Sequence, residues 1–414
     1  MPTDRNGYAL ATGEAAAAAF NEGMEKLLSA NAGAAAAFGR AIEADPTYAP
    51  AHIALARFHQ IHANRAEAKA ALANAREHVG RFSGREAGLV HCLGLVLEGK
   101  ADLALPAIQA HLREFPRDAL ALSPCTGVFG LYGFSGLAGR DRALREYLDS
   151  LAPAFGEDWW FLVQHGFALV ETFDEALGKA KVDRALELFP RDANGAHIRA
   201  HARYELGETR AGLDELTLWT RDYARESLLH CHLDWHRALW TLKLGRHDEA
   251  WSLYRAGVAP GAIWGPSLNL ATDAAAFLLR AELAGDARIP DEWRRVAAYC
   301  DAEFPRAGIA FLDVHALLAS AMAGDAAGFA ARKAGLRGPA ADIVAGLGDA
   351  FDAFAKGRPG ACADFLAPWL ATHVRIGGSR AQRDLLEELH LAALTQAGRE
   401  AEAADYAKTR RRGL

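Results

Sequence analysis

The chain has 414 residues and a net charge of −6, with 51% hydrophobic and 24% charged residues. This composition is typical of a soluble protein with a packed core. The negative balance argues against nucleic-acid binding, which needs a basic surface to neutralise phosphates. No stretch of about 20 apolar residues is free of charges, so we expect no membrane-spanning segment.

The five cysteines are scattered and form no CxxC pair. A dispersed, odd set of this kind favours a reducing compartment and excludes the common cysteine-rich zinc sites. The alanine run at 15–19 lacks the basic start of a signal peptide. We therefore expect a cytoplasmic protein.

Helices are predicted along the whole chain, because Ala and Leu dominate and β-branched runs of strand length are absent. The glycine-rich stretch 127–139 is the least regular part and is expected to distort one repeat. In chain order, the apolar spacing predicts helix pairs at 51–62 with 65–79, 86–98 with 101–115, 159–171 with 174–189, 193–206 with 210–223, 228–244 with 247–255, 268–284 with 291–304, 311–323 with 326–336, 340–356 with 362–373, and 380–397 with 400–411.

A short motif recurs at helix ends. Phe115-Pro116-Arg117-Asp118-Ala119 is repeated at 189–193, and a partial copy lies at 304–307. Proline stops the preceding helix, because its ring and missing N–H forbid continuation. A weaker version of the motif is Asp45-Pro46, and the interval of 70 residues from Pro46 to Pro116 is about two tetratricopeptide periods. We predict an all-α, tightly wound tetratricopeptide-like superhelix of roughly nine to eleven helix pairs, with residues 1–414 as one continuous domain.

Two histidine pairs are the strongest indication of function. His197 and His201 are four residues apart, and the same spacing recurs 35 residues later in His232 and His236. The i,i+4 spacing places both imidazoles of a pair on one helical face, about 5–6 Å apart at Cβ. Residues one repeat apart occupy equivalent places on neighbouring helices. The four side chains are therefore expected to converge, because packed helix axes lie about 8–10 Å apart.

Several kinds of chemistry fit such a convergence. Imidazole binds Zn, Fe, Ni and Cu ions, and Asp313 or Glu205 would add a carboxylate ligand, so a divalent metal cofactor is one hypothesis. Imidazole is also the usual proton-transfer group near neutral pH, which makes the four histidines and Asp313 candidate catalytic residues. The alternative to metal binding and catalysis is that the four histidines form buried hydrogen bonds between helices or polar contacts to a peptide.

Further polar and aromatic side chains fall on the first helix of each predicted pair, the one that lines the concave surface of a tetratricopeptide stack. A tight superhelix would bring such positions together across turns, so Asp313, His315 and Arg383 are expected in one pocket with the four histidines. The candidate ligand-binding residues are His165, Trp235, Asp273, His315, Gln382, Arg383 and Asp384.

The segment 377–384 places two glycines and Ser379 before a helix. Ser379 is the candidate N-cap. The N–H groups of the helix start, together with Arg383, would hold an anion or a carboxylate. An ordinary capped turn explains the same residues, since every helix needs its first N–H groups satisfied.

At these residues the sequence resembles the tetratricopeptide repeat protein 38 family. The most specific matches are Cys231-His232-Leu233-Asp234-Trp235-His236-Arg237-Ala238-Leu239 and the segment 377–384; others lie at 8–12, 165–171, 196–201 and 311–316. The resemblance implies an all-helical superhelix but supplies no reaction. Family members usually carry a Glu three residues after the second histidine of the first pair, where this chain has Tyr204.

Two classes of function follow. In the first, the concave pocket binds a small-molecule or short peptide ligand, and the paired histidines catalyse a reaction if there is one. In the second, the protein is a non-enzymatic scaffold that binds a partner peptide, another protein or a second copy of itself. A groove lined with His, Trp and Asp favours the first class. Neither class involves nucleic acid or a membrane.

Overall fold

The computed structural model describes residues 1–409, and within this range the chain is all-α, with 22 α-helices. Strand-type pairing among these residues is limited to an isolated antiparallel bridge between Thr3 and Ala9. The first twelve helices are α1 (Glu14–Leu28), α2 (Ala34–Ala44), α3 (Ala49–Ile61), α4 (Arg65–His78), α5 (Gly84–Leu97), α6 (Ala101–Glu114), α7 (Ala119–Leu122), α8 (Arg140–Phe155), α9 (Trp159–Glu171), α10 (Glu175–Leu188), α11 (Ala193–Glu205) and α12 (Thr209–Thr220).

The second part of the chain continues in the same manner. Its helices are α13 (His230–Lys243), α14 (His247–Leu253), α15 (Ser267–Leu283), α16 (Pro290–Glu303), α17 (Ala310–Ala323), α18 (Ala326–Ala334), α19 (Ala341–Ala355), α20 (Pro359–Leu366), α21 (Arg380–Gln396) and α22 (Glu400–Thr409). Consecutive helices pack as pairs, and the first helices of successive pairs also contact one another, as in α11–α9, α13–α15 and α15–α17. This is the arrangement of a tetratricopeptide-like solenoid.

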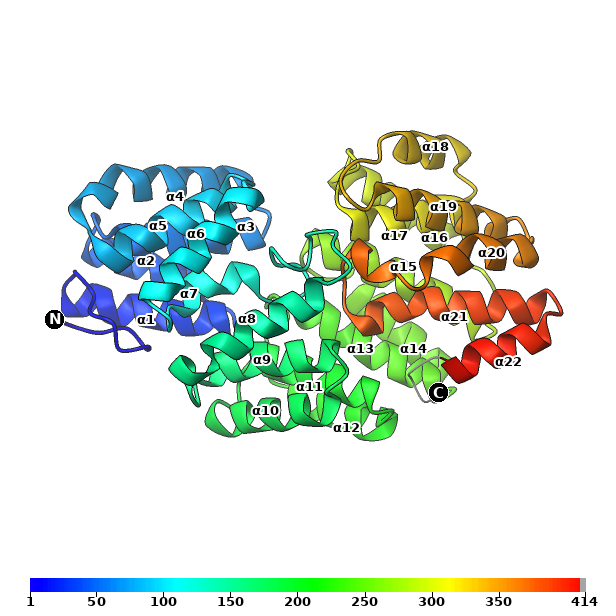
Figure 1. The fold of residues 1–414 in the computed structure, drawn as a ribbon, viewed down its shortest axis with the longest axis horizontal. Coiled ribbons are helices and arrows are strands. Elements are labelled where there is room, and N and C mark those ends of the chain that lie inside the picture. Colours follow the sequence, from blue (N-terminus) through cyan, green and yellow to red (C-terminus); the bar gives the residue numbers. More distant parts are fainter. Residues whose placement is uncertain (410–414) are drawn as a thin grey trace.

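The superhelix is tightly wound, since distant repeats touch. Figure 1 shows α1–α7 as one group, α8–α12 below it, and α13–α22 as the other group. The end of α1 meets α11, where the N–H of Ala193 donates to the carbonyl of Ser29 at 3.0 Å. At the other end of the chain, α21 packs against both α15 and α11. The C-terminal helices therefore return to the middle of the array.

The repeated Phe-Pro-Arg-Asp motif is a helix-to-helix joint. Phe115 and Phe189 each occupy the C-cap of one helix, and the Asp three residues later caps the next. Asp118 accepts the N–H of Ala121, and Asp192 accepts that of Asn194. A side-chain oxygen at this position satisfies an N–H that has no partner inside the helix. Where the motif ends in Ala307 instead, the following α17 has no side-chain cap.

The predicted all-α fold and the nine predicted helix pairs are confirmed, with ends that differ by a few residues; positions 410–411 of the last predicted helix lie outside the described residues. The largest difference is at 362–373, where α20 begins earlier, at Pro359, and ends at Leu366 before short 3₁₀ turns. The stretch 127–139 is irregular, as expected. The pair α1–α2, the short helix α7 and helix α8 are not predicted from the sequence. No helix within the described residues is long and apolar enough to cross a membrane.

Asp118 and Asp325 form a matched pair of caps for a stability test. Both accept an N–H from the first turn of their helix, but Asp118 also pairs with Arg85 at 3.2 Å and His111 at 3.0 Å. We expect Asp325→Ala to cost about 1 kcal/mol of unfolding free energy, the usual value of a lost cap. Asp118→Ala should cost more, about 2–4 kcal/mol, because it also removes a buried partner of both Arg85 and His111, although Arg85 keeps its ion pair with Asp4. Thermal melts followed by circular dichroism measure both, and equal losses would contradict this ranking.

Candidate metal centre

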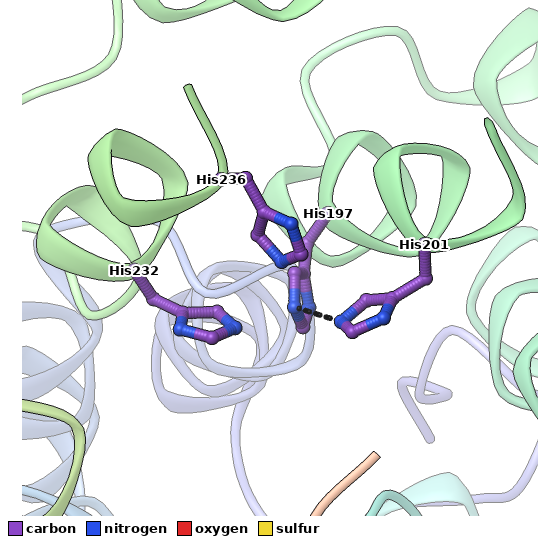
Figure 2. Close-up of side chains that lie close together, drawn as sticks. All are labelled: His197, His201, His232 and His236. Carbon is purple, nitrogen blue, oxygen red and sulfur yellow. Dashed lines mark hydrogen bonds between the residues drawn. The ribbon is translucent and has the colours of Figure 1, made fainter. Parts of the chain in front are cut away.

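Four imidazoles converge between α11 and α13, and we call them the tetrahistidine cluster: His197, His201, His232 and His236. One potential ligand atom from each lies within 4.8 Å of those of the other three. Figure 2 shows His197 and His201 reaching from one helix and His232 and His236 from the other, with the rings facing a common centre. The two i,i+4 pairs thus meet in the register that the repeat period predicts.

The ring geometry suits a small central ion. The Nε2 atoms of His197 and His201 are 2.9 Å apart, a distance at which one ring N–H donates to the other ring nitrogen. His236 lies 4.6 Å from His201 and 4.8 Å from His232 between ring centroids. Ligand nitrogens around a tetrahedral ion, at metal–nitrogen distances near 2.0–2.1 Å, lie about 3.3 Å from one another. Small ring rotations would therefore bring the four nitrogens to coordinating distance.

A carboxylate orients one of the four rings. The Nδ1–H of His232 donates to Oδ2 of Asp273, on α15, at 2.6 Å. This bond leaves the Nε2 lone pair of His232 available on the opposite side of the ring. Metal-binding histidines commonly donate their second ring N–H to a carboxylate in this way. Burial raises the pKa of Asp273, while His232 and hydrogen bonds from Gln382 and Asn269 oppose that rise.

The cluster is largely enclosed by protein. His201, His232 and His236 are 1%, 3% and 1% exposed, and His197 is the least enclosed of the four. Burial holds the pKa of His197 and His236 well below the ordinary value, and the neighbouring histidines lower both further. These two imidazoles are therefore neutral near pH 7, which is the form that binds a metal.

Aromatic rings form the wall behind the cluster. The Trp235 ring stacks on His232 with centroids 5.1 Å apart and planes at 13°, and Trp240 lies 6.1 Å from His236. Among the described residues, the buried indole N–H of Trp235 and Nε2 of His236 have no hydrogen-bond partner. A buried polar atom without a partner is costly in a folded protein. At His236, coordination of an ion through Nε2 would remove that cost.

Asp313 lies elsewhere, and the expectation that it shares the cluster is wrong. Its carboxylate accepts a guanidinium N–H of Arg332 on α18 at 2.9 Å and the N–H of Gly308 at 2.8 Å. Positions two apart on a helix point to different sides, so Asp313 and His315 cannot face the same pocket. His315 is buried on the inner side, where its Nδ1–H donates to the carbonyl of Phe311 at 2.7 Å.

Two other predicted residues also have partners away from the tetrahistidine cluster. His165 pairs with Asp149 of α8 at 2.7 Å between Nε2 and Oδ1. Glu205, considered as an added carboxylate ligand, instead pairs with Arg380 of α21 at 2.8 Å. The physical reason is the same in both cases. A charged partner on a neighbouring helix, which the sequence does not locate, takes the polar side chain.

The start of α21 holds a carboxylate, and it is the protein's own. Oε2 of Glu171 accepts the N–H of Arg380 at 2.8 Å and lies 3.6 Å from the Arg383 guanidinium. Ser379 and Gln382 complete a capping box. Arg383 pairs with Glu171 and Asp141 and lines a cavity to which none of the four histidines contributes, which corrects the predicted shared pocket. The sequence signal for an anion here was sound, but Glu171 was missed because it lies 209 residues from Arg380.

Gln382 and Asp384 connect α21 to the neighbourhood of the cluster. Gln382 hydrogen-bonds with Asp273, the carboxylate that orients His232. Asp384 accepts the hydroxyl of Tyr204 at 2.7 Å, and Tyr204 lies one turn beyond His201 on α11. Sequence reasoning missed Arg280, which lies over the Trp235 ring at 5.8 Å. Its position seven residues after Asp273 on the same helical face was the available signal.

Comparison with known proteins adds little beyond the fold. No family model matches the chain. A crystal structure of the P58(IPK) TPR (tetratricopeptide repeat) domain is similar over 92% of this chain and 99% of that one, at 15% sequence identity and a TM-score of 0.21. A likeness this weak carries no conclusion about function, so the functional argument depends on the residues themselves.

Acid should destabilise the folded chain in part through His315. Burial lowers the pKa of His315 to about 4, against an ordinary value of 6.5. Between these pH values the unfolded chain binds a proton that the folded chain does not. The stabilisation is therefore complete above pH 6.5 and is lost as the pH falls towards 4, by about 3 kcal/mol. Thermal melts at pH 7.5, 6 and 4.5 should show a shallower decline for His315→Met than for the unsubstituted protein. Parallel declines would rule out this contribution.

Proposed function

We propose that the chain is a metal-dependent ligand-binding protein that holds one divalent transition-metal ion in the tetrahistidine cluster. The observation that carries this proposal is the Asp273–His232 bond of 2.6 Å behind four converging, buried imidazoles. A cluster meant only for inter-helix hydrogen bonds would not need four imidazole rings around one centre. The orienting carboxylate and the unpartnered Nε2 of His236 are both features expected of a metal ligand set.

The donor set narrows the class of metal. Four neutral nitrogen ligands suit Zn, Cu, Ni or Fe, whereas Mg and Ca require oxygen ligands. A tetrahedral ion would have all its positions filled by protein, as in structural zinc sites. A square-planar or tetragonal Cu or Ni ion would keep axial positions for a further ligand. We assign no reaction to the site, because the number of open positions depends on the metal.

The family and the extent of the folded unit also belong to this proposal. We place the chain with the tetratricopeptide repeat protein 38 family on the matches around His232 and at 377–384. These segments carry half of the cluster and the start of α21. We also propose that the whole chain folds as one continuous unit and acts in the cytoplasm. The contacts of α21 with α11 and α15, and of α1 with α11, support the continuous unit.

Metal binding predicts a stability change that chelation reverses. An ion that binds only the folded state, at a free concentration 100 times its Kd, adds about 2.7 kcal/mol of stability. Protein treated with a chelator should therefore melt at a lower temperature, and Zn²⁺, Ni²⁺ or Cu²⁺ should restore the melting temperature with one ion per chain. His236→Gln should abolish the restoration, while His165→Gln, which changes a buried histidine outside the cluster, should keep it. Elemental analysis measures the stoichiometry.

Asp273 provides a finer arm of the same experiment. Asp273 orients His232 and is not itself a ligand. Asp273→Asn should therefore lower the affinity for the metal by about 10–100-fold while all four histidine ligands remain. Absence of any metal gain by the chain at pH 7.5, or an unchanged melting temperature after removal of a measured metal, would refute the proposal.

A second candidate function is peptide binding, favoured by a cavity of about 1180 Å³ between α8–α9 and α20–α22. Its walls carry both charges, with Arg142 and Glu146 on α8 opposite Glu387 on α21. Mixed charges over so large a volume fit an extended peptide better than a compact small molecule. A peptide selected from a display library against the protein should lose affinity with Arg142→Glu but keep it with Lys69→Glu, on the distant α4. Equal affinity for both variants would exclude this cavity.

A further inference from the structure

A second, smaller cavity of about 550 Å³ lies at the other side of α21, between α11, α13 and α15. Its size is that of a site for a small organic molecule. Leu239, Leu242, Leu283 and Leu391 form much of its wall, and a few polar side chains interrupt them. The Tyr204–Asp384 hydrogen bond lies in this wall, so the cavity borders the joint between α11 and α21.

The cavity continues the helical faces that carry the tetrahistidine cluster. Tyr204 follows His201 by three residues, and Leu239 and Lys243 follow His236 by three and seven. These intervals keep a side chain on the same face of a helix. At 1.5 Å per residue, Leu239 and Lys243 lie about 5 and 10 Å beyond His236 along α13. The cavity therefore begins about one turn from the proposed metal.

Arg280 is shared by the two sites. It lines the cavity, lies over the Trp235 ring, and its charge helps to lower the pKa of His236. Its Nε donates to Glu388 at 2.9 Å and its Nη2 donates to the carbonyl of Ala381 at 2.9 Å. Its Nη1 has no partner among the described residues, although the side chain is 93% buried, at 7% exposure.

The two carboxylates in the cavity wall are already engaged, whereas two basic groups there, Arg280 Nη1 and the Lys243 ammonium, have no hydrogen-bond or ion-pair partner within residues 1–409. Glu388 is engaged by Arg280, and Asp384 is engaged by Tyr204. Lys243, at the mouth, forms no ion pair within residues 1–409; its ammonium lies 5.9 Å from the Tyr204 ring centroid. An occupant that complements these walls needs an apolar body and an anionic group. A carboxylate at Lys243 would form a charge-assisted hydrogen bond.

We propose that this cavity binds a small organic carboxylate with an apolar body, held by Lys243 at the mouth and by the leucine walls. The inference deepens the proposed function, since it names the ligand class for a site that shares Arg280 with the metal centre. It does not depend on which metal is bound.

The test uses octanoate as the probe, with octan-1-ol and octylamine as neutral and cationic counterparts of equal length. Calorimetric titration is run on the full chain in chelator-treated and metal-loaded forms. We expect octanoate to bind both forms, octanol to bind about tenfold more weakly, and octylamine not to bind, because a hydrogen bond between charged groups is worth about one power of ten or more in affinity. Lys243→Gln should remove the advantage of octanoate over octanol, and Lys69→Gln should retain it.

Ala392→Phe, which fills the cavity from α21, should abolish binding of both octanoate and octanol while the melting curve stays cooperative. Equal affinities for octanoate and octanol, or octanoate binding that survives Lys243→Gln and Ala392→Phe, would overturn the inference.

The carboxylate proposal and the metal proposal can fail separately. Loss of the octanoate result with metal binding intact overturns only this one, and octanoate binding in a chain that takes up no metal overturns only the metal centre.

Discussion

The convergence of four imidazoles between α11 and α13 is the constraint on which the rest of the structure depends. An ionisable ring inside a helical stack is costly unless its nitrogens find partners. The chain supplies one of those partners directly, in the 2.6 Å bond between His232 and Asp273. The Trp235 ring packs against His232, and Nε2 of His236 has no hydrogen-bond partner among the described residues. Three successive first helices must therefore stay in register for the cluster to exist.

Helix α21 is the element that maintains this register. Its first turn is joined to α9 through the Glu171–Arg380 bond, and its Gln382 contacts the carboxylate that orients His232. One turn further, Asp384 accepts from Tyr204, and then Glu388 holds Arg280. This one C-terminal helix thus contacts α9, α11 and α15. A perturbation of α21 would therefore affect the tetrahistidine cluster and both cavities beside this helix.

The same helix separates two environments of different chemistry. On one side lies the large cavity with mixed charges, and on the other lies the leucine-walled cavity with Lys243 at its mouth. This division explains why the predicted single pocket did not form. Arg383 and Asp384 are neighbours in sequence, yet about 100° of helical rotation sends the first to Glu171 and the second to Tyr204.

Local patterns in the sequence were sufficient for the fold class, the helix pairs and the meeting of the two histidine pairs. The proline after Phe115 or Phe189 disfavours continuation of the helix before it, and an i,i+4 spacing keeps two rings on one face in any helix. The repeat period then carries that face to the next helix. Tertiary structure alone decided which partner each polar side chain meets. Asp313 pairs with Arg332, Glu205 with Arg380 and Asp273 with His232. These pairs could not be predicted, because the distance in space between two helices is unrelated to their separation in the chain.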